Sequence, residues 1–395
     1  MGSRAGVLAT HSPAERCTAG VDTVFVPPAR ALVLERPRTL VDRELALPSV
    51  GPDDGLLRVE ACGLCGTDHE QYTGHRPAGF GFVPGHETVG IIEEVGDRAA
   101  ERWGVQAGDR VAVEVFQSCR ECEECRAGRY RRCVRHGLAD MFGFIDVEKA
   151  PGLWGGYATH HYLGPDAMLL PLPDRLDPVV ATLFNPLGAG IRWTTTVGGA
   201  GEGDVVVVLG PGIRGLSACV AAKEAGAAFV AVTGVGPRDT DRLELASRFG
   251  ADLAIDVAVE HPGKAVRQAT GGRQADVVVD VTAKAPAALG QAVGLARPGG
   301  TIVLAGTRGT DDTPGFAPDH VVYKELTIVG ALGVDVVAYR AAIDVLVSRR
   351  WPFEDLPRIA AGFEGVEGLL QAMAGERDGA PVHGVFTPIR TVVGL

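Results

Sequence analysis

The 395-residue sequence has no run of about 18 apolar residues, which is the minimum that a membrane-spanning helix needs. Its most apolar region, residues 205–235, is interrupted by Arg214, Lys223 and Glu224. The N-terminal residues show no basic segment followed by an apolar one, so no secretory signal peptide is predicted. The sequence therefore predicts a cytoplasmic protein that does not associate with membranes.

Basic residues are also in short supply. The chain has 38 Lys and Arg against 49 Asp and Glu, which gives a formal net charge of −11. A domain that binds nucleic acid or an anionic membrane usually carries a basic stripe. The one basic cluster, residues 126–135, lies in a cysteine-rich segment, and we interpret it as a solvent-exposed face. We predict neither nucleic acid nor a membrane surface as a partner.

What the sequence does contain is typical of a globular protein with two domains. Apolar residues make up 46% of the chain, and 54 residues are glycine. Residues 1–27 are rich in Ala, Gly, Ser, Thr and Pro and are expected to form a loose extension. In a cytoplasmic protein the eight cysteines should stay reduced, and their clustering favours metal binding over disulfides.

One cysteine cluster has the spacing C-x2-C-x2-C-x7-C. Its members are Cys119, Cys122, Cys125 and Cys133. Four thiolates can close a tetrahedron around Zn²⁺ and thereby hold a lobe, about residues 117–135, that has little core of its own. A disulfide pair or free thiols are the alternatives, and we favour a structural zinc site.

A second group of potential ligands lies upstream. Cys65 is followed by the hydroxyl of Thr67, and His86 and Glu87 are adjacent. A thiolate, an imidazole and a carboxylate are zinc ligands, and three of them with one open position form a catalytic site. The alternative is a core thiol with a surface histidine.

From Asp204 onward the pattern is that of a doubly wound dinucleotide-binding fold. The apolar strand 205–209 runs into a G-x-G-x-x-G segment, which opens a helix over 216–225. Together with that strand, the predicted parallel strands are 205–209, 229–233, 253–256, 276–281, 301–305 and 327–331. The residues predicted to contact the cofactor are Gly210, Gly212, Ile213, Arg214, Gly215, Gly234, Arg238 and Thr282.

The end of the second predicted strand bears on the choice of cofactor. NAD-binding folds place an acid there for the ribose 2′-hydroxyl, and this sequence has Gly234. Arg238 can pair with a 2′-phosphate, whereas Asp239 or Asp241 can reach the ribose instead. The alternative is that this loop is an ordinary solvated turn. We favour NADP(H) over NAD(H).

The first part of the chain reads as strands and loops with little helix. The predicted strands are 31–34, 56–61, 89–95, 110–115 and 157–162. His160 and His161 should point to opposite faces as surface or edge-strand histidines. The segment 184–190 is expected to lead into a helix. Four aromatic residues are candidates for a pocket, although core positions are favoured for each: Phe144, Trp154, Phe184 and Trp193.

The motifs CGLCGTD, GHETVG, the cysteine lobe, LWGGYA and VLGPGIRG occur in this order. In these motifs the chain resembles the zinc-containing medium-chain alcohol and polyol dehydrogenases over about residues 30–390. The resemblance implies an α/β protein. A GroES-like, mostly-β catalytic domain would comprise residues 28–190 and 335–395, and a Rossmann domain residues 191–334. It also implies zinc, a nicotinamide cofactor, a small alcohol or ketone substrate, and a homodimer or homotetramer.

Carried over by position, the resemblance makes Cys65 and His86 ligands of the catalytic zinc, and Glu87 a ligand or a close neighbour. Thr67 would relay the substrate proton. Two positions depart from the pattern of many members. Asn185 stands where a Cys or Glu ligand is common, and Glu70 stands where a relay histidine is common.

The sequence thus predicts a reversible transfer of hydride between an alcohol or polyol and a nicotinamide cofactor. One alternative is a zinc-independent quinone or enoyl reductase, which would lack the pair Cys65 and His86. Another is a non-catalytic member of the fold, which would bind cofactor without turnover. Asn185 and Glu70 keep that second alternative open.

Overall fold

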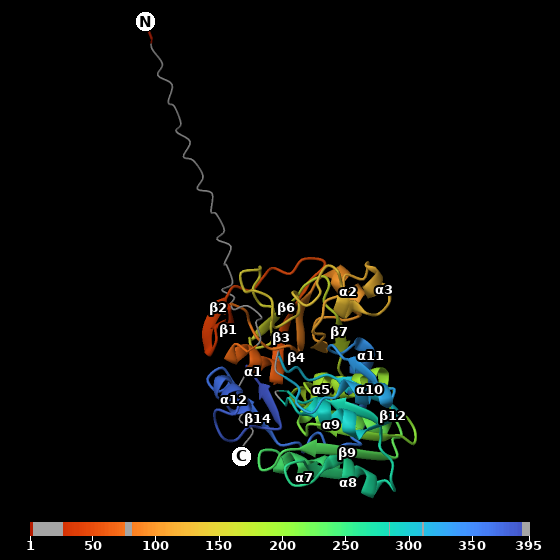
Figure 1. Ribbon diagram of the computed structural model, residues 1–395. Helices are drawn as coiled ribbons and strands as arrows, with labels where there is room; N and C mark the ends of the chain where they lie inside the picture. The colour runs from red at the N-terminus through yellow and green to blue at the C-terminus, as the bar shows by residue number, and fades with distance from the viewer. Residues whose placement is uncertain (3–26, 76–80, 284, 310–311, 389–395) are drawn as a thin grey trace.

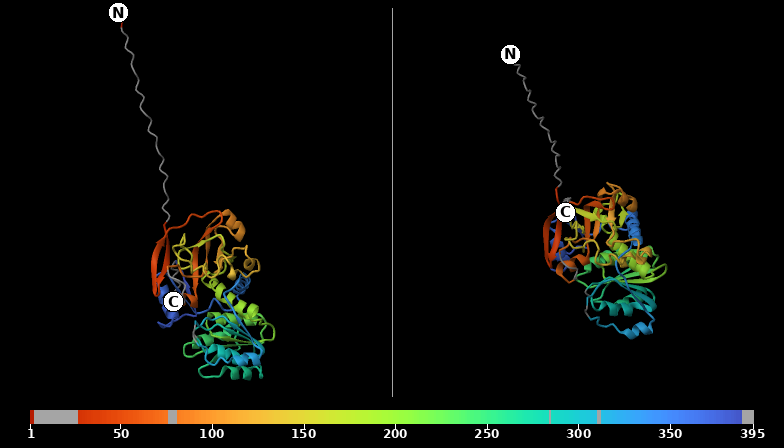
Figure 2. Two further views of the ribbon diagram at one scale, coloured as in Figure 1. Left: turned by 45° about the horizontal axis from the view of Figure 1, so that its top comes forward. Right: turned by 90° about the horizontal axis from the view of Figure 1, so that it is seen from above.

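The computed structural model describes residues 1–2, 27–75, 81–283, 285–309 and 312–388. The predicted N-terminal extension lies almost entirely outside these residues. Figures 1 and 2 show two parts, each built around one sheet, with the C-terminal segment lying against the first part. In the described part of the chain, no helix has the length and apolar character needed to cross a membrane.

The first part is a mostly-β domain. Its main sheet has the order β14-β15-β3-β4-β5-β7, and β6 pairs with β3. The strands are β3 (Gly55–Leu64), β4 (Glu87–Val95), β5 (Arg110–Val113), β6 (His160–Leu163), β7 (Leu169–Pro171), β14 (Arg358–Ala361) and β15 (His383–Phe386). A separate hairpin is formed by β1 (Ala29–Arg36) and β2 (Thr39–Leu45).

The register of this sheet brings Cys65 and His86 close together. β3 and β4 are antiparallel, with Gly63 opposite Glu87. Because Cys65 directly follows β3 and His86 directly precedes β4, both lie at the same end of this strand pair. The C-terminal strand β15 pairs with the same end of β3, from Cys62 to Leu64.

The first part holds more helix than the sequence predicts. The helices are α1 (Gly66–Thr73), α2 (Asp97–Trp103), α3 (Glu123–Arg126) and η1 (Tyr130–Arg132). They are too short for an apolar period to stand out in the sequence. A further helix, α12 (Val366–Met373), packs on α1, where the Tyr72 hydroxyl donates to Glu367 at 2.9 Å.

The second part is a parallel sheet of order β10-β9-β8-β11-β12-β13, which confirms the doubly wound Rossmann fold. The strands are β8 (Val205–Leu209), β9 (Phe229–Gly234), β10 (Leu253–Asp256), β11 (Ala275–Asp280), β12 (Ala296–Leu304) and β13 (Thr327–Gly330). The helices are α6 (Ile213–Glu224), α7 (Thr240–Ala246), η3 (Ser247–Phe249), α8 (Pro262–Ala269), α9 (Ala288–Leu295) and α10 (Pro318–Tyr323).

Both faces of the parallel sheet are buried, which explains its continuous apolar strands. Val206 and Val208 face a core shared with α6, whereas Val205, Val207 and Leu209 face a core shared with α8 and α9. The alternation follows from the two-residue period of a strand.

Helical segments connect the two parts. They are α4 (Pro178–Ala181), α5 (Phe184–Ile191), η2 (Arg192–Val197) and α11 (Val336–Ser348). The segment 184–190 is therefore itself helical, although the sequence predicts only that it leads into a helix. A Cβ at Gly190 would meet the backbone of Ser217 at 2.5 Å, so glycine permits the close packing of α5 on α6. The predicted domain boundaries, at residues 190/191 and 334/335, stay a prediction.

Candidate catalytic site

Cys65 is the N-cap of α1, and a capping box holds it there. The Thr67 N–H donates to the Cys65 Sγ at 3.4 Å, and the Cys65 N–H donates to Asp68 Oδ2 at 2.7 Å. These two bonds fix the Cys65 Sγ at the N-terminus of the helix, beside the end of β3. The Cys-x-x-Asp spacing of the capping box is a sequence signal for this arrangement.

Three ligand types meet at the end of the β3–β4 pair. One ligand atom each from Cys65, His86 and Glu87 lies within 4.8 Å of the others, and all three residues are buried. The second carboxylate oxygen of Asp68 lies 3.4 Å from His86 Nδ1, so Asp68 contacts both Cys65 and His86. This donor set fits Zn²⁺ with an open position.

Glu87 is held in a site with little room. Glu87 is 2% exposed, and a Cβ at Gly63 would overlap the Glu87 carboxylate. Burial raises the pKa of Glu87 to about 7, against the opposing effect of the charges on His86 and Arg214. A buried carboxyl of this kind needs a cation nearby when it ionises.

Arg214 supplies a cation at this cluster, which the sequence does not predict. It stands on the first turn of α6, inside the glycine segment, and its guanidinium donates to Cys65 Sγ at 2.9 Å. The same nitrogen lies 3.8 Å from the Glu87 carboxylate, and the guanidinium lies 5.3 Å from the centre of the Trp193 ring. The sequence places Arg214 only in the cofactor site.

A cavity of about 230 Å³ opens next to the cluster, between the two domains. The predicted residues Thr67, Glu70 and Asn185 line it together with Cys65 and His86. Asn185 is 3% exposed, and its amide nitrogen donates to the Tyr339 hydroxyl at 2.9 Å.

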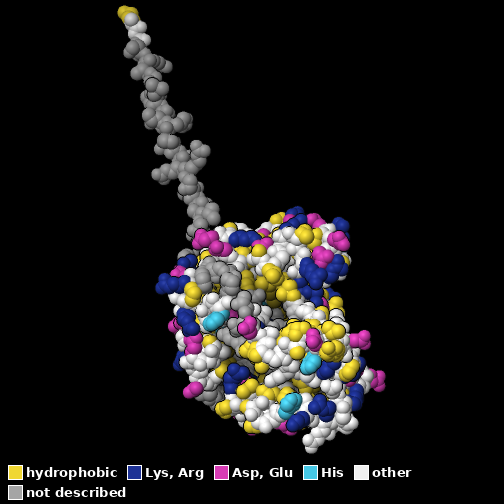
Figure 3. Space-filling model, viewed as in Figure 1, with side chains coloured by type: hydrophobic (Ala, Val, Ile, Leu, Met, Phe, Trp, Pro, Cys, Tyr) yellow, Lys and Arg dark blue, Asp and Glu magenta, His cyan; other side chains and the backbone are white. Residues whose placement is uncertain are grey.

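Two of the four aromatic candidates, Phe144 and Trp193, line this cavity and also pack against core clusters, so each has both of the positions that the sequence left open. Phe184 and Trp154 are core residues. Figure 3 shows hydrophobic side chains in a hollow between the two parts.

A groove of about 400 Å³ continues from the cavity along the Rossmann domain. The residues that line both are Cys65, Gly66, Arg214, Val281 and Ala283. All eight residues predicted to contact the cofactor line this groove. The cavity and the groove meet at the thiol, where a substrate and a cofactor would meet.

The glycine segment fits a dinucleotide. A Cβ at Gly215 would overlap the carbonyl oxygen of Gly210, so helix and strand pack there only without a side chain. A Cβ at Gly212 would meet nothing within 4 Å, which leaves open space above the N-terminus of α6. The free N–H groups and the dipole of such a helix favour a pyrophosphate.

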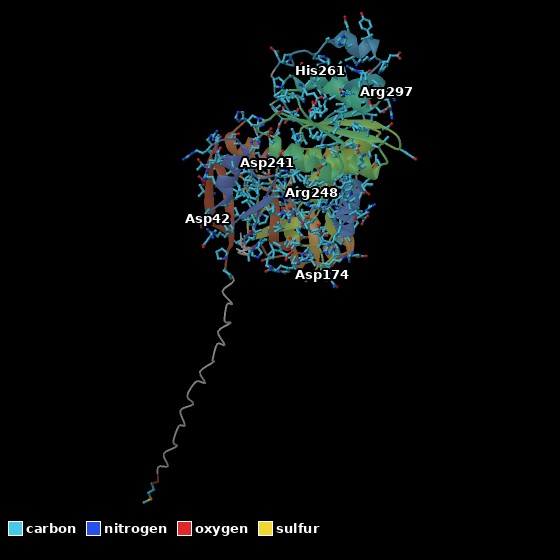
Figure 4. The ribbon with its side chains drawn as sticks, turned by 90° about the horizontal axis from the view of Figure 1, so that it is seen from below. Asp42, Asp174, Asp241, Arg248, His261 and Arg297 are labelled. Atoms are coloured by element: carbon cyan, nitrogen blue, oxygen red, sulfur yellow. The ribbon has the colours of Figure 1, made fainter. Side chains whose placement is uncertain are left out.

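At the far end of the groove, Gly234 closes β9 and contacts the loop that follows. Asp239 accepts the Val235 N–H at 3.0 Å and pairs with Arg242 at 3.2 Å and with Arg238 at 3.6 Å. The Arg238 side chain is 78% exposed. Asp241, which Figure 4 labels, is exposed and lies outside the groove lining.

The four cysteines of the lobe form a second cluster. Their sulfur atoms lie within 4.8 Å of one another. The Cys122 N–H donates to Cys119 Sγ, and the Cys125 N–H donates to Cys122 Sγ, each at 3.4 Å. Burial raises the pKa of the Cys133 thiol, but backbone hydrogen bonds outweigh this effect and lower its pKa to about 6. Four such thiols fit a closed zinc site.

The lobe is joined to the wall of the cavity by buried polar groups. The Tyr130 hydroxyl donates to Glu114 at 2.8 Å and accepts the Val336 N–H at 2.8 Å. Arg131 lies 3.5 Å from Asp335, and its side chain is 11% exposed. The interpretation of residues 126–135 as a solvated face is therefore wrong for Arg131.

The two adjacent histidines differ. His160 is half-buried and lies 3.1 Å from Glu93. His161 is fully buried against Phe142, with ring centroids 4.8 Å apart, and burial lowers its pKa to about 3. The assignment of His161 to the surface is wrong, because β6 is covered by the core of the first domain.

Comparison with known proteins identifies the family. Residues 51–174 match the family model of the alcohol dehydrogenase GroES-like domain, and residues 215–348 match that of the zinc-binding dehydrogenases. A probable alcohol dehydrogenase of Mycobacterium tuberculosis is 67% identical over 361 residues, which cover 91% of this chain and 98% of the relative. The chain belongs to the zinc-containing medium-chain alcohol dehydrogenase family.

Other members of the zinc-containing medium-chain alcohol dehydrogenase family are more distant. The erythritol/L-threitol dehydrogenase of Mycolicibacterium smegmatis is 32% identical and covers 83% of this chain and 89% of its own. The solved alcohol dehydrogenase of Thermus sp. ATN1 is 27% identical with a TM-score of 0.78. A zinc-binding dehydrogenase of Sinorhizobium meliloti, bound to NADP, is 25% identical with a TM-score of 0.79. The alignments to these two solved structures each cover 91% of this chain and 99% of the solved chain.

Proposed function

We propose that this protein oxidises alcohols reversibly to ketones or aldehydes, with one zinc ion and a nicotinamide cofactor at the active site. The observation that carries the proposal is the junction at Cys65, which lines both the cavity and the groove, while the clustered His86 lines the cavity and Glu87 lines the groove. A zinc-independent reductase would have no use for three buried ligand atoms within 4.8 Å.

Cys65, His86 and Glu87 would hold the catalytic zinc. Bound there, zinc would supply a Lewis acid that lowers the pKa of an alcohol hydroxyl. Asp68 orients His86 and holds the N-cap geometry of Cys65. The amide nitrogen of Asn185 is engaged by Tyr339, so its carbonyl oxygen is the polar atom left to face a ligand or a water.

The side chains of α1 would move the substrate proton. The Thr67 hydroxyl accepts it in the cavity, and Glu70, one helical turn further, is the next titratable group of the helix that lines the cavity. Glu70 thereby takes the place of the expected histidine. A nicotinamide bound in the groove would supply the hydride acceptor.

The cofactor we propose is NADP(H). Gly234 leaves no carboxylate at the end of β9 to repel a 2′-phosphate, and Arg238 and Arg242 line that end of the groove. Asp239 is engaged with Val235 and Arg242, which makes it less available to a ribose hydroxyl.

The ratio of kcat/KM for NADP⁺ to that for NAD⁺ tests this choice. Arg238→Ala should lower the ratio about tenfold, because a charged hydrogen bond to the phosphate is lost. Arg248→Ala is a matched control, since Arg248 is exposed, pairs with Asp355 and lies outside the groove (Figure 4). A preference for NAD⁺ that neither substitution changes would contradict the proposal.

The four-cysteine lobe would hold a second zinc ion, which gives two per chain. Elemental analysis of the purified protein should therefore find about two zinc ions, and about one in Cys65→Ser. A value near one in the unmodified protein, unchanged by Cys65→Ser, would leave Cys65, His86 and Glu87 without a metal.

Turnover tests the proposal as a whole. The zinc-replete protein, mixed with NADP⁺ or NAD⁺ and simple alcohols, should develop the absorbance of the reduced nicotinamide. Cofactor binding without turnover of any alcohol or polyol would instead favour the non-catalytic alternative.

We also propose a homodimer or homotetramer in the cytoplasm. β13 is the last strand of its sheet, and the neighbouring helix α10 exposes Val322 and Tyr323, which are 71% and 77% exposed. An open strand edge beside exposed apolar residues is typical of a contact between subunits. Light scattering on the purified protein would measure the oligomeric state.

A further inference from the structure

We infer that the substrate is an apolar alcohol, with a hydrocarbon or aromatic body and no second hydroxyl beyond the reacting centre, and is not a polyol. The inference rests on the proposed function and narrows its substrate class. It is carried by the distribution of polar and apolar side chains in the cavity beside Cys65.

One part of the cavity lining is an apolar wall that both domains build. Its members are Phe116, Met141, Phe144, Trp193, Leu332 and Val334. Phe144 lies 5.8 Å from the His86 ring, so the wall begins directly beside a proposed zinc ligand. A Cβ at Gly333 would meet the Phe116 ring at 2.6 Å, which shows how tightly the loop before α11 closes this wall.

The indole N–H of the wall and the carbonyl groups of its last loop are hydrogen-bonded within the protein. The Trp193 indole N–H donates to the Gly333 carbonyl at 3.0 Å. Arg192 donates to the carbonyl groups of Leu332 and Gly333 at 3.4 and 3.3 Å. The side chains of the wall therefore present rings and aliphatic groups, because the one indole N–H among them already has a partner.

The polar side chains of the cavity are concentrated beside the ligands. Thr67 and Glu70 stand on α1, which starts directly after Cys65. The guanidinium of Arg214 is engaged by Cys65 and Glu87, so it offers little to a substrate carboxylate. Asn185 and Tyr339 also line the cavity, and the Asn185 amide nitrogen donates to the Tyr339 hydroxyl. Thr307 lies on the Rossmann side, just after β12.

This distribution discriminates against polyols. When the reacting hydroxyl lies at the ligand cluster, side chains of α1 can hydrogen-bond to it and to a hydroxyl on the neighbouring carbon. Hydroxyls further along the carbon skeleton of the substrate would face the apolar wall. A hydroxyl buried without a partner costs about 1–3 kcal/mol, or about 5-fold to 150-fold in kcat/KM for each such group. Each methylene buried on the same wall instead adds about 0.8 kcal/mol, or about fourfold.

Matched pairs of substrates test the inference. The zinc-replete protein with saturating cofactor is assayed on ethanol, butan-1-ol, butan-2-ol, hexan-1-ol and benzyl alcohol, and on erythritol and sorbitol. We expect kcat/KM to rise about fourfold per methylene from ethanol until the cavity is filled. We also expect at least a tenfold preference for the butanols over erythritol, and for hexan-1-ol over sorbitol.

A substitution in the wall adds a second readout. Leu332→Asn places an amide of similar size in the wall, and it should lower kcat/KM for hexan-1-ol about tenfold while that for sorbitol holds or rises. Leu138→Asn is the control, because Leu138 is 50% exposed, Leu332 is 46% exposed, and only Leu332 lines the cavity. The control should leave every ratio unchanged.

The outcomes separate the two proposals. Oxidation of erythritol or sorbitol that equals or exceeds that of the matched alkanol would overturn the inference and leave the alcohol dehydrogenase function intact. A flat series from ethanol to hexan-1-ol would overturn it as well. If no alcohol and no polyol is oxidised with either cofactor, the proposed function itself is wrong, and the inference falls with it.

Discussion

Replacing Glu114 with glutamine should change how the stability of this protein depends on pH. Glu114 follows β5, is 0% exposed, and accepts hydrogen bonds from the Phe116 N–H at 3.1 Å and the Tyr130 hydroxyl at 2.8 Å. Burial raises its pKa to about 8, although Tyr130, Phe116 and Arg131 oppose the rise.

The sign of the effect follows from this raised pKa. Between about pH 4.5 and about pH 8 the folded protein keeps the proton on Glu114, whereas the unfolded chain releases it. The folded state binds more protons in this range, so the free energy of unfolding falls as the pH rises, by about 1.4 kcal/mol per pH unit for one group. Over the full interval from about pH 4.5 to about pH 8, the free energy of unfolding falls by at most about 5 kcal/mol.

Glu114→Gln removes the titrating group and keeps the size of the side chain. The free energy of unfolding of the variant, minus that of the unmodified protein, should therefore rise by about 1.4 kcal/mol per unit from pH 6 to pH 8. Urea unfolding of zinc-replete protein at several pH values measures this difference. Glu148→Gln, at an exposed carboxyl, shows what the same substitution does on the surface.

A difference that stays flat from pH 6 to pH 8 would refute the reasoning. It would mean that Glu114 is already ionised in the folded protein, and that the hydrogen bonds from Tyr130 and Phe116, with the nearby Arg131, outweigh burial.

Three further predictions concern the two ligand clusters. Cys122→Ser should remove one zinc ion and lower the melting temperature strongly, because a closed site contributes folding energy directly. Zinc analysis measures the lost ion, and a thermal melt measures the lost stability. An unchanged melting temperature with one zinc ion missing would contradict this prediction. Arg214→Met should tighten zinc binding about tenfold in a chelator competition and destabilise the zinc-free protein, because a positive charge beside Cys65 and Glu87 is lost. Arg214→Lys keeps the charge, so its zinc affinity and its zinc-free stability should stay close to those of the unmodified protein. Asn185→Ala should reduce kcat more than it reduces the melting temperature, and an equal loss of folding would assign Asn185 a structural role only.

The sequence by itself determined the Rossmann half of the fold. A buried parallel strand must be apolar on both faces, and Val205–Leu209 shows this pattern without interruption before the glycines. The four closely spaced cysteines and the pair His86 and Glu87 were equally readable, because metal ligands near one another in sequence stay near one another in space. The helix α1 was not readable, since eight residues hold only two turns of any period.

Tertiary structure decided what lies around these residues. Cys65 and Arg214 are 149 residues apart, and only the docking of α6 against the end of β3 brings the guanidinium to the thiol. His161 could be buried only by a core assembled from distant strands, and the apolar wall joins Phe116 and Phe144 of the first domain to Leu332, which follows the last strand of the parallel sheet. A local pattern specifies which face of a strand or helix is apolar. The partner of that face depends on long-range packing, and the character of the cavity follows from that packing.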